Sequence, residues 1–443
     1  MRFQPIRRAA SILCLLLALV VALPAQAQTL LRDADMEYAL KQLAAPILRA
    51  AGLSPNRVKV LVVNAPTLNA FVVSNDAIFI HHGLINKMES APMLQGIIAH
   101  EAAHIANGHI TRRLTNLANT RTITGLGIAL AAAAAASGNN RLAGGLAIGS
   151  ASSARRAFLS HTRAEEASAD QSGIRYMAAA GASPQGLYDT LKIFAGQEAL
   201  SAGRQDPYLR SHPLTRDRLR AVQGFVTSYG TKPPNADAEY WFARLKGKLS
   251  AYTRAPSWTL RRLKSEPYAD VRLLREAIAQ HRNSRTQKAL AAIDRAIAAR
   301  PNDPFLHDQR GQILLETRNF AAATNAYARA VQRAPNDPLI LSGYGRALLA
   351  SGQVAKARGV LEKSRRQDFR DGSMLRDLAT AYAKSGQTGM AALTTAERFA
   401  LIGRLKDAGI HAKRATALLA TGSGPWQRAQ DVLIASERAA KRK

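Results

Sequence analysis

A 34-residue period organises the second half of the chain. The tetrapeptide PNDP occupies residues 301–304 and again 335–338, and other columns recur at the same spacing. Two columns hold small residues and a third holds large ones. The small columns are Ala277, Gly311, Gly345 and Ala379, and Ala289, Ala323, Ala357 and Ala391; the large column is Ile293, Tyr327 and Leu361. Small residues let paired helices cross closely, a large one fills the gap between pairs, and proline ends each second helix. The sequence therefore predicts stacked helix pairs.

This pattern resembles the tetratricopeptide repeat, whose period is the same. The resemblance implies an all-α solenoid over residues 270–443, with atypical capping helices from about residue 401. Such stacks bind extended peptides or protein segments in a concave groove. We expect the array to recruit a protein partner.

The N-terminus predicts export. Arg2, Arg7 and Arg8 precede the apolar run SILCLLLALVVAL, and an A-x-A site ends at Ala27. This is the pattern of a cleavable secretory signal peptide over residues 1–27, and a retained anchor is the alternative. Cys14, the only cysteine, lies in this segment, so the mature chain has no thiol for a disulfide or a zinc site. The expected location is the periplasm.

The charge is strongly basic, with 61 lysines and arginines against 31 acidic residues and a formal net charge of +30. Such an excess suits nucleic acid, anionic lipid or an acidic partner, although a solvated basic surface is the simplest interpretation. Because an exported protein seldom meets nucleic acid, we expect none as a partner and favour association with an anionic membrane surface or another envelope component.

The first half of the mature chain alternates helical and β-rich segments. A helix is expected from Thr29 to Ala50, short strands at 58–64, 69–73 and 77–81, and a helix from near Pro92. The stretch between Arg121 and Arg141, which has no charged residue, predicts a buried helix, with a membrane-touching lid as the alternative. We expect one domain over residues 28–229, followed by a linker and connecting helices over 230–269. His81 and His82 are interpreted as strand-end residues.

Residues 96–109 read GIIAHEAAHIANGH. His100 and His104 are one helical turn apart, so both imidazoles can reach one metal ion, with Glu101 beside them. This H-E-x-x-H spacing is typical of zinc peptidases, in which the glutamate takes a proton from an attacking water. Unpaired imidazoles would be costly in so apolar a helix, which argues against a purely structural role. One Zn²⁺ per chain is predicted.

The third protein ligand is expected in the stretch SHTRAEEASADQSG, residues 160–173. Glu165 or Glu166 can serve, and spacing alone does not separate them; a buried Asp170 can hold the other nitrogen of a ligating histidine. His109 is rejected as a ligand, because a continuing helix would carry it to the far side of His100. If the chain turned instead, the spacing would still be one residue short of H-E-x-x-H-x-x-G-x-x-H.

The sequence resembles the gluzincin metallopeptidases that include HtpX heat-shock proteases and CAAX prenyl proteases. The resemblance rests on HEAAHIANGH at 100–109, NAF at 69–71, GLI at 83–85 and TRAEEASAD at 162–170. Ala102 and Ala103 depart from that pattern, but both avoid the ligand face. The resemblance implies an α+β metallopeptidase domain with a small β-sheet and an active-site helix. It places the glutamate ligand at Glu166 and the supporting aspartate at Asp170.

The element SHPLTRDR, residues 211–218, is similar to a further motif of that family. The resemblance implies that His212 stabilises the oxyanion or occupies the open zinc position and keeps the enzyme latent, and that Arg218 pairs with an active-site carboxylate. A histidine hydrogen-bonded at a helix start is the structural alternative. By the same resemblance, a peptide substrate adds as a strand beside Asn69, Ala70 and Phe71; an ordinary interior strand is the alternative.

Exported members of this family with C-terminal tetratricopeptide repeats are similar to the BepA-type proteases, which act in outer-membrane β-barrel assembly. The resemblance implies a periplasmic zinc endopeptidase that cuts misfolded or stalled envelope proteins and meets the outer-membrane assembly machinery through its repeats. Two alternatives remain: a chaperone or adaptor with rare or gated proteolysis, and a binder of anionic lipid.

Overall fold

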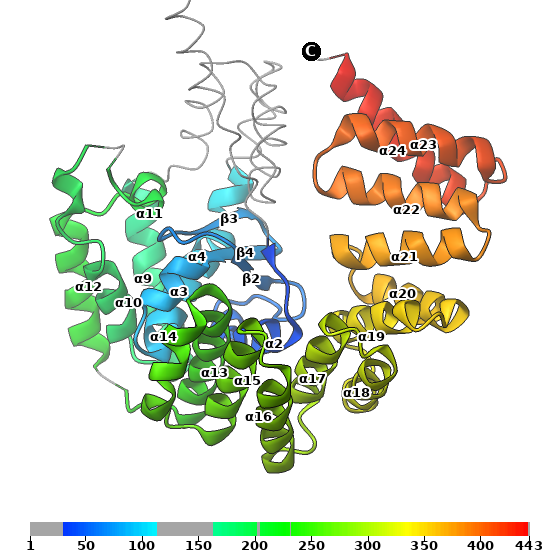
Figure 1. Cartoon of the computed structure of the whole chain (residues 1–443). Coiled ribbons are helices and arrows are strands. Elements are labelled where there is room, and N and C mark those ends of the chain that lie inside the picture. The colour runs from blue at the N-terminus through cyan, green and yellow to red at the C-terminus, as the bar shows by residue number, and fades with distance from the viewer. Residues whose placement is uncertain (1–29, 113–162, 202–203, 231, 442–443) are drawn as a thin grey trace, which may run out of the picture.

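The computed structural model describes residues 30–112, 163–201, 204–230 and 232–441. Within these ranges, a mainly helical domain with one small sheet precedes a curved row of helix pairs (Figure 1). This arrangement confirms the predicted fold class. The predicted signal peptide and the uncharged stretch between Arg121 and Arg141 lie outside the described residues. No helix in the described ranges has both the length and the apolar character of a membrane span.

The sheet has the strand order β1-β2-β4-β3. The strands are β1 Leu30–Leu31, β2 Lys59–Val63, β3 Ala70–Ser74 and β4 Ala77–His81. β2 and β4 run parallel, whereas β1 and β3 are antiparallel to their neighbours. Val60 and Val62 alternate with less buried residues along β2 and enter the core beneath the helices. β3 pairs with β4 alone among the described strands, so it forms an edge of the sheet.

The predicted helix at Thr29–Ala50 is wrong at its start. Leu30 and Leu31 form β1 and pair with Val63 and Val62, and helix α2 begins only at Ala34. The physical reason is the cap: the Asp33 side chain accepts a hydrogen bond from the Met36 backbone N–H at 2.9 Å and fixes the first turn. The leucines fit helical periodicity, but their partners lie about thirty residues further along the chain.

The first domain is built mainly from helices, with α4 among them. Their bounds are α2 Ala34–Ala50, α3 His82–Lys87, α4 Ala91–Ala106, α9 Arg163–Ala179, α10 Gln185–Lys192, α11 Pro207–Ser211, α12 Arg216–Tyr229, α13 Ala236–Thr253 and α14 Pro256–Arg261. α4 packs against α2, α9 and α10, and its residues from Met93 to Ile105 are buried. Backbones of α4 and α10 come close at Gly96 and Gly186: a Cβ added to Gly186 would lie 2.2 Å from the carbonyl of Pro92. The helix with the H-E-x-x-H motif is therefore the centre of this domain.

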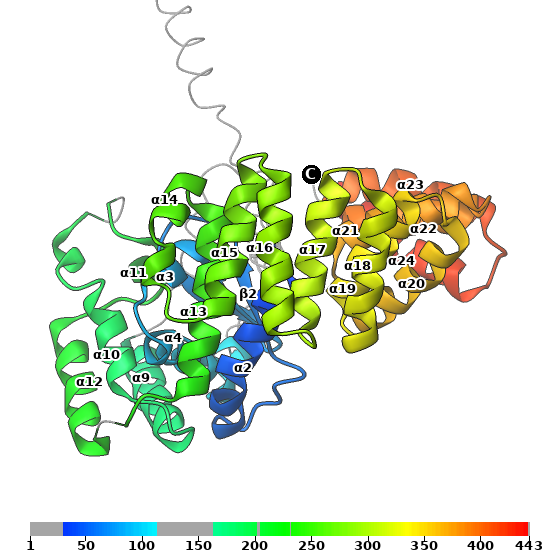
Figure 2. The same cartoon turned by 60° about the horizontal axis from the view of Figure 1, so that its bottom comes forward.

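Helix pairs follow in the order that the 34-residue period predicted. They are α15 Ala269–Arg282, α16 Thr286–Ala299, α17 Pro304–Glu316, α18 Phe320–Arg333, α19 Pro338–Ala350, α20 Val354–Gln367, α21 Gly372–Lys384, α22 Thr388–Leu401, α23 Leu405–Leu418 and α24 Gly424–Ala440. Figure 2 shows α15 to α19 side by side, and Figure 1 shows the array continuing upward through α20 to α24. A Cβ on Gly311 or Gly345 would lie 2.7 or 2.5 Å from the large side chain of Tyr327 or Leu361, so the small columns do permit close crossing. The PNDP motif has a local cause: Asp303 and Asp337 cap α17 and α19, each followed by proline in the first turn.

Helix α13 joins the two parts, because it packs on α2 and on α15. Arg244 of α13 is buried; its Nε donates to Asp35 at 2.7 Å, and its Nη1 donates to Asp303. A second contact lies further along the array, where Asp368 accepts hydrogen bonds from Arg32 and Lys59 at 2.7 and 3.0 Å. The array thus meets the first domain at two places, and α13, within the predicted linker, belongs to the main core.

Candidate metal centre

Helix α4 brings His100 and His104 to one face. The helix starts after Ser90, with Pro92 in its first turn, and both histidines are 0% exposed. The two Nε2 atoms lie 3.2 Å apart. Because the residues are four apart, their side chains project in nearly the same direction, as the sequence predicted.

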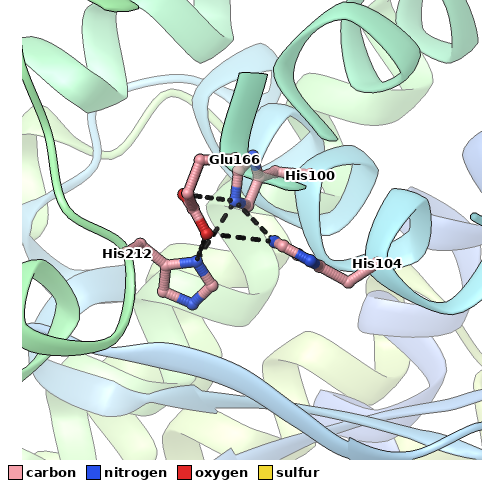
Figure 3. A group of neighbouring side chains, drawn as sticks. All are labelled: His100, His104, Glu166 and His212. Atoms are coloured by element: carbon pink, nitrogen blue, oxygen red, sulfur yellow. Dashed lines mark hydrogen bonds and ion pairs between the residues drawn. The ribbon is translucent and has the colours of Figure 1, made fainter. Parts of the chain in front are cut away.

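Helix α9 and the end of α11 complete the group. Glu166 and His212 are also 0% exposed, and the four ligand atoms of His100, His104, Glu166 and His212 lie within 4.8 Å of one another (Figure 3). The Glu166 carboxylate lies 3.5 Å from His104 Nε2 and 3.0 Å from His212 Nδ1. Glu165, which spacing had left open, is outside this group.

The donor set fits a small divalent cation. Four ligands placed tetrahedrally around zinc are separated by about 3.3 Å, since each bond to nitrogen or oxygen is about 2.0–2.1 Å. The separations here include 3.2 Å for the two α4 histidines, 3.3 Å for His100 Nε2 to His212 Nδ1, and 3.5 Å for Glu166 to His104 Nε2. The other ring nitrogens of both α4 histidines face neighbours at hydrogen-bond distance. Each α4 histidine can therefore carry its proton on Nδ1 and present a bare Nε2 to a cation.

Glu101 lies next to the group without belonging to it. It is fully buried, and neither carboxylate oxygen has a hydrogen-bond partner among the described residues; His212 Nε2 is 3.5 Å from Oε1. Burial raises the pKa of the Glu101 carboxyl, against the opposing effect of His212 and His100. A buried carboxylate with two open acceptor positions is suited to take a proton from a water molecule.

Asp170 and Arg218 support the group from behind. Asp170 Oδ1 is 3.0 Å from His100 Nδ1, and Arg218 donates from Nη2 to the same oxygen at 2.9 Å. Arg218 Nη1 also lies 2.6 Å from Glu166 Oε2. Burial favours the neutral acid, but Arg218 and His100 hold the pKa of Asp170 below its ordinary value. The Thr215 side chain accepts a hydrogen bond from the Arg218 backbone N–H. This cap fixes the start of α12, the helix that carries Arg218.

The predicted substrate strand lies beside the group. Helix α11 is tied to the start of β3 by a hydrogen bond from the Tyr208 backbone N–H to the Leu68 carbonyl at 3.2 Å. Ala70 is buried, Phe71 stacks on Phe79 with ring centroids 5.3 Å apart, and the Asn69 side-chain oxygen has no hydrogen-bond partner. Helix α11, which ends at the residue before His212, is therefore attached to the start of the edge strand β3.

The sequence analysis missed Tyr208 as a neighbour of the site and considered His109 only as a ligand, which it rejected. Tyr208 stacks on His212 at 4.6 Å between ring centroids, is fully buried, and its hydroxyl has no hydrogen-bond partner. Burial raises the pKa of this hydroxyl well above its ordinary value, so it keeps its proton. His109 lies outside the four-residue group and contacts His104 instead. Nothing in the spacing of Tyr208 marks it as a neighbour of the centre.

Comparison with known proteins supports the division seen in the structure. Residues 31–226 match the model of peptidase family M48, and residues 314–382 match a tetratricopeptide repeat model. The metallopeptidase domain and the repeats predicted from the sequence are thereby confirmed.

Among curated relatives, the beta-barrel assembly-enhancing protease of Yersinia pestis is 25% identical over 189 residues, which are 42% of this chain and 38% of that protein. Metalloprotease LoiP of Escherichia coli is 25% identical over 45% of this chain and 75% of its own length. The mitochondrial metalloendopeptidase OMA1 of Schizosaccharomyces pombe is 25% identical over 44% of this chain and 55% of its own. The matched part of this chain thus covers well under half of the first relative. Among solved structures, MamA MSR-1 C2 overlays 37% of this chain and 96% of its own, at 18% identity and a TM-score of 0.31, too low to support a conclusion.

Proposed function

We propose that this chain, which carries a peptidase family M48 domain followed by tetratricopeptide repeats, is a zinc-dependent endopeptidase. One observation supports this most directly: His100, His104 and Glu166 converge within ligand distance while the buried Glu101 carboxylate beside them lacks any hydrogen-bond partner. Three ligands with one open position are the donor set of catalytic zinc sites.

His100, His104 and Glu166 would hold the metal. When bound, zinc acts as a Lewis acid that activates water and polarises the substrate carbonyl. Glu101 accepts the proton that water loses as its oxygen forms a bond to the peptide carbon. Glu101 then donates this proton to the amide nitrogen as the carbon–nitrogen bond breaks, so the products are a carboxylic acid and an amine, and Glu101 is regenerated.

His212 is proposed to keep the resting enzyme latent. Its Nδ1 is 3.3 Å from His100 Nε2 and 3.0 Å from Glu166 Oε1, which puts it among the ligand atoms. Occupation of the fourth position by His212 would exclude water and substrate together. Tyr208 stacks on its ring and holds this placement.

The substrate is proposed to be an extended segment of a misfolded or stalled envelope protein. It would add beside the edge strand β3 at Asn69, Ala70 and Phe71, with main-chain hydrogen bonds that tolerate many sequences. The repeats would recruit the client or a component of the outer-membrane assembly machinery. The relatives named for beta-barrel assembly support this choice, as does the export pattern at the N-terminus, which indicates the periplasm. The net charge of +30 is compatible with association with an anionic membrane surface.

The test uses purified full-length protein loaded with zinc, and an unfolded protein as the substrate. Glu101→Gln should retain zinc but lose cleavage by at least about 100-fold, because general-base catalysis contributes that much. Glu166→Ala should lose zinc, and His212→Ala should cleave faster than the parent. His307→Ala, at a buried histidine of α17 in the array, is the matched control and should change neither property.

Results that contradict the proposal can be told apart by which variant gives them. If Glu101→Gln cleaves like the parent, the peptidase mechanism is wrong. If biological activity persists in Glu101→Gln while cleavage is lost, the adaptor function is the better account. If His212→Ala retains zinc but cleaves more slowly, His212 stabilises the oxyanion and is no latch.

A further inference from the structure

The two ring nitrogens of His104 have different surroundings. Nε2 faces His100 and Glu166 in the metal group, whereas Nδ1 lies 2.8 Å from Nδ1 of His109. His109 is only 2% exposed. A histidine rejected as a ligand from its spacing therefore contacts a ligand from behind.

The turn after α4 produces this contact. The helix ends at Ala106, and Gly108 adopts a left-handed φ of +70°, so the chain leaves the helical path and returns His109 to the His104 side. The Asn107 side-chain amide donates to Ser168 Oγ at 3.0 Å and Ser172 Oγ at 3.2 Å, both on α9. The turn is thus attached to the helix that carries Glu166.

Hydrogen-bond chemistry fixes the protons on both rings. A metal ligand at Nε2 needs that lone pair bare, so the proton of neutral His104 lies on Nδ1. An N–H at this position requires an acceptor, and His109 Nδ1, at 2.8 Å, serves when it is bare. His100 has the equivalent arrangement with a carboxylate, since its Nδ1 faces Asp170 at 3.0 Å.

We infer that His109 is a positioning residue: its Nδ1 accepts the His104 N–H and holds His104 in the tautomer and orientation that bind the metal. This inference rests on the proposed zinc site. The two α4 ligands then differ in support, one through a charged carboxylate and one through a neutral imidazole. Partners of this kind typically contribute 10- to 100-fold to metal affinity.

The decisive experiment measures zinc affinity by chelator competition in His109→Asn and His109→Phe. Asparagine places an amide oxygen near the position of Nδ1 and keeps the acceptor, whereas phenylalanine keeps the ring volume and removes it. His109→Phe should bind zinc about 10- to 100-fold more weakly, and His109→Asn within about 3-fold of the parent. His307→Phe, which alters a buried histidine of the array, is the control. Melting curves of the zinc-free proteins separate this effect from a general loss of structure.

A second pair of variants tests the turn. Gly108→Ala and Gly52→Ala place a Cβ at nearly the same left-handed φ, +70° and +71°; among the described residues only the tip of Arg112 lies near the first, and none lies near the second. The backbone strain should be similar, but only Gly108→Ala should weaken zinc binding.

The outcomes separate the two proposals. If the parent binds no zinc, the proposed function fails and the inference fails with it. If the parent binds zinc and His109→Phe binds it equally well, the inference alone is overturned. If His109→Asn weakens binding as much as His109→Phe, the acceptor role is wrong. Equal affinities for Gly108→Ala and the parent would contradict the role of the turn.

Discussion

Asp368→Asn should weaken the attachment of the repeats to the peptidase domain. Asp368 lies between α20 and α21, with its side chain 3% exposed, and its Oδ2 accepts from Arg32 Nη2 at 2.7 Å and Lys59 Nζ at 3.0 Å. Asparagine has the same shape, and its side-chain oxygen can still accept from the Arg370 backbone N–H, as Oδ1 does at 3.0 Å. The substitution therefore removes the charge and leaves the local turn in place.

The magnitude follows from the pKa of Asp368. Burial opposes ionisation, but Arg32 and Lys59 prevail and lower the pKa from 3.8 to about 2. Nearly two pKa units correspond to about 2 kcal/mol of favourable interaction at neutral pH. Because the pKa is lower in the folded state, this contribution is complete above the unfolded value near 3.8 and is lost as the pH falls through about 2. The difference between parent and variant should shrink to about half by pH 3.

The assay is urea unfolding at low ionic strength, followed by tryptophan fluorescence, since Trp241 is on the junction helix α13 and a salt denaturant would screen the charges. Asp217→Asn is the control. The side chains of Asp217 and Arg220 form an ion pair but are 85% and 77% exposed, so losing this pair should change the free energy of unfolding by less than about 0.5 kcal/mol. A variant at Asp368 that matches this control at pH 7, or a difference that stays constant down to pH 3, would refute the reasoning.

Three further predictions concern the framework of the site. Gly186→Ala should destabilise the protein by about 1–3 kcal/mol, because its Cβ would collide with the α4 backbone, whereas Gly224→Ala, in open space on α12, should stabilise it by up to about 1 kcal/mol; urea unfolding compares them. Arg218→Met should lower the stability of the zinc-free protein by about 3–5 kcal/mol, because two buried carboxylates lose their partner, and zinc should restore part of it; melting with and without zinc is the measurement. Tyr208→Phe should keep or raise the melting temperature, since the lost hydroxyl has no hydrogen-bond partner.

The repeats could be predicted because their contacts are local. Each helix pairs with the next, so the small residue at Gly345 meets the large one at Leu361 only sixteen positions later, as Gly311 meets Tyr327. A fixed period therefore carries most of the structural information. Leu30 and Leu31 show the opposite case: the choice between strand and helix depended on Val62 and Val63, which local periodicity does not reveal.

The metal group was predictable in part. His100 and His104 share a helix, so their direction follows from spacing alone, whereas Glu166 depends on which face of α9 meets α4. The sequence does indicate which face of α9 is buried, because the small and apolar residues Ala169, Gly173 and Met177 lie on the same side of the helix as Glu166. The contact of His109 depends on the turn at Gly108, and a histidine five residues after a ligand has no fixed direction until that turn is known.

The junction gives one motif of the repeats a second function. Asp303 of the first PNDP copy caps α17 through Oδ1, and its Oδ2 accepts a hydrogen bond from the buried Arg244. Asp35 of α2 accepts from the same arginine. Because α2 packs on α4, the array is connected to the helix that carries His100 through α13 and α2. Removing one member of such a buried network leaves the others unpaired, so separating the repeats from α13 and α2 would be costly. If the array recruits a client, as proposed, this attachment would set where the client enters relative to the edge strand β3.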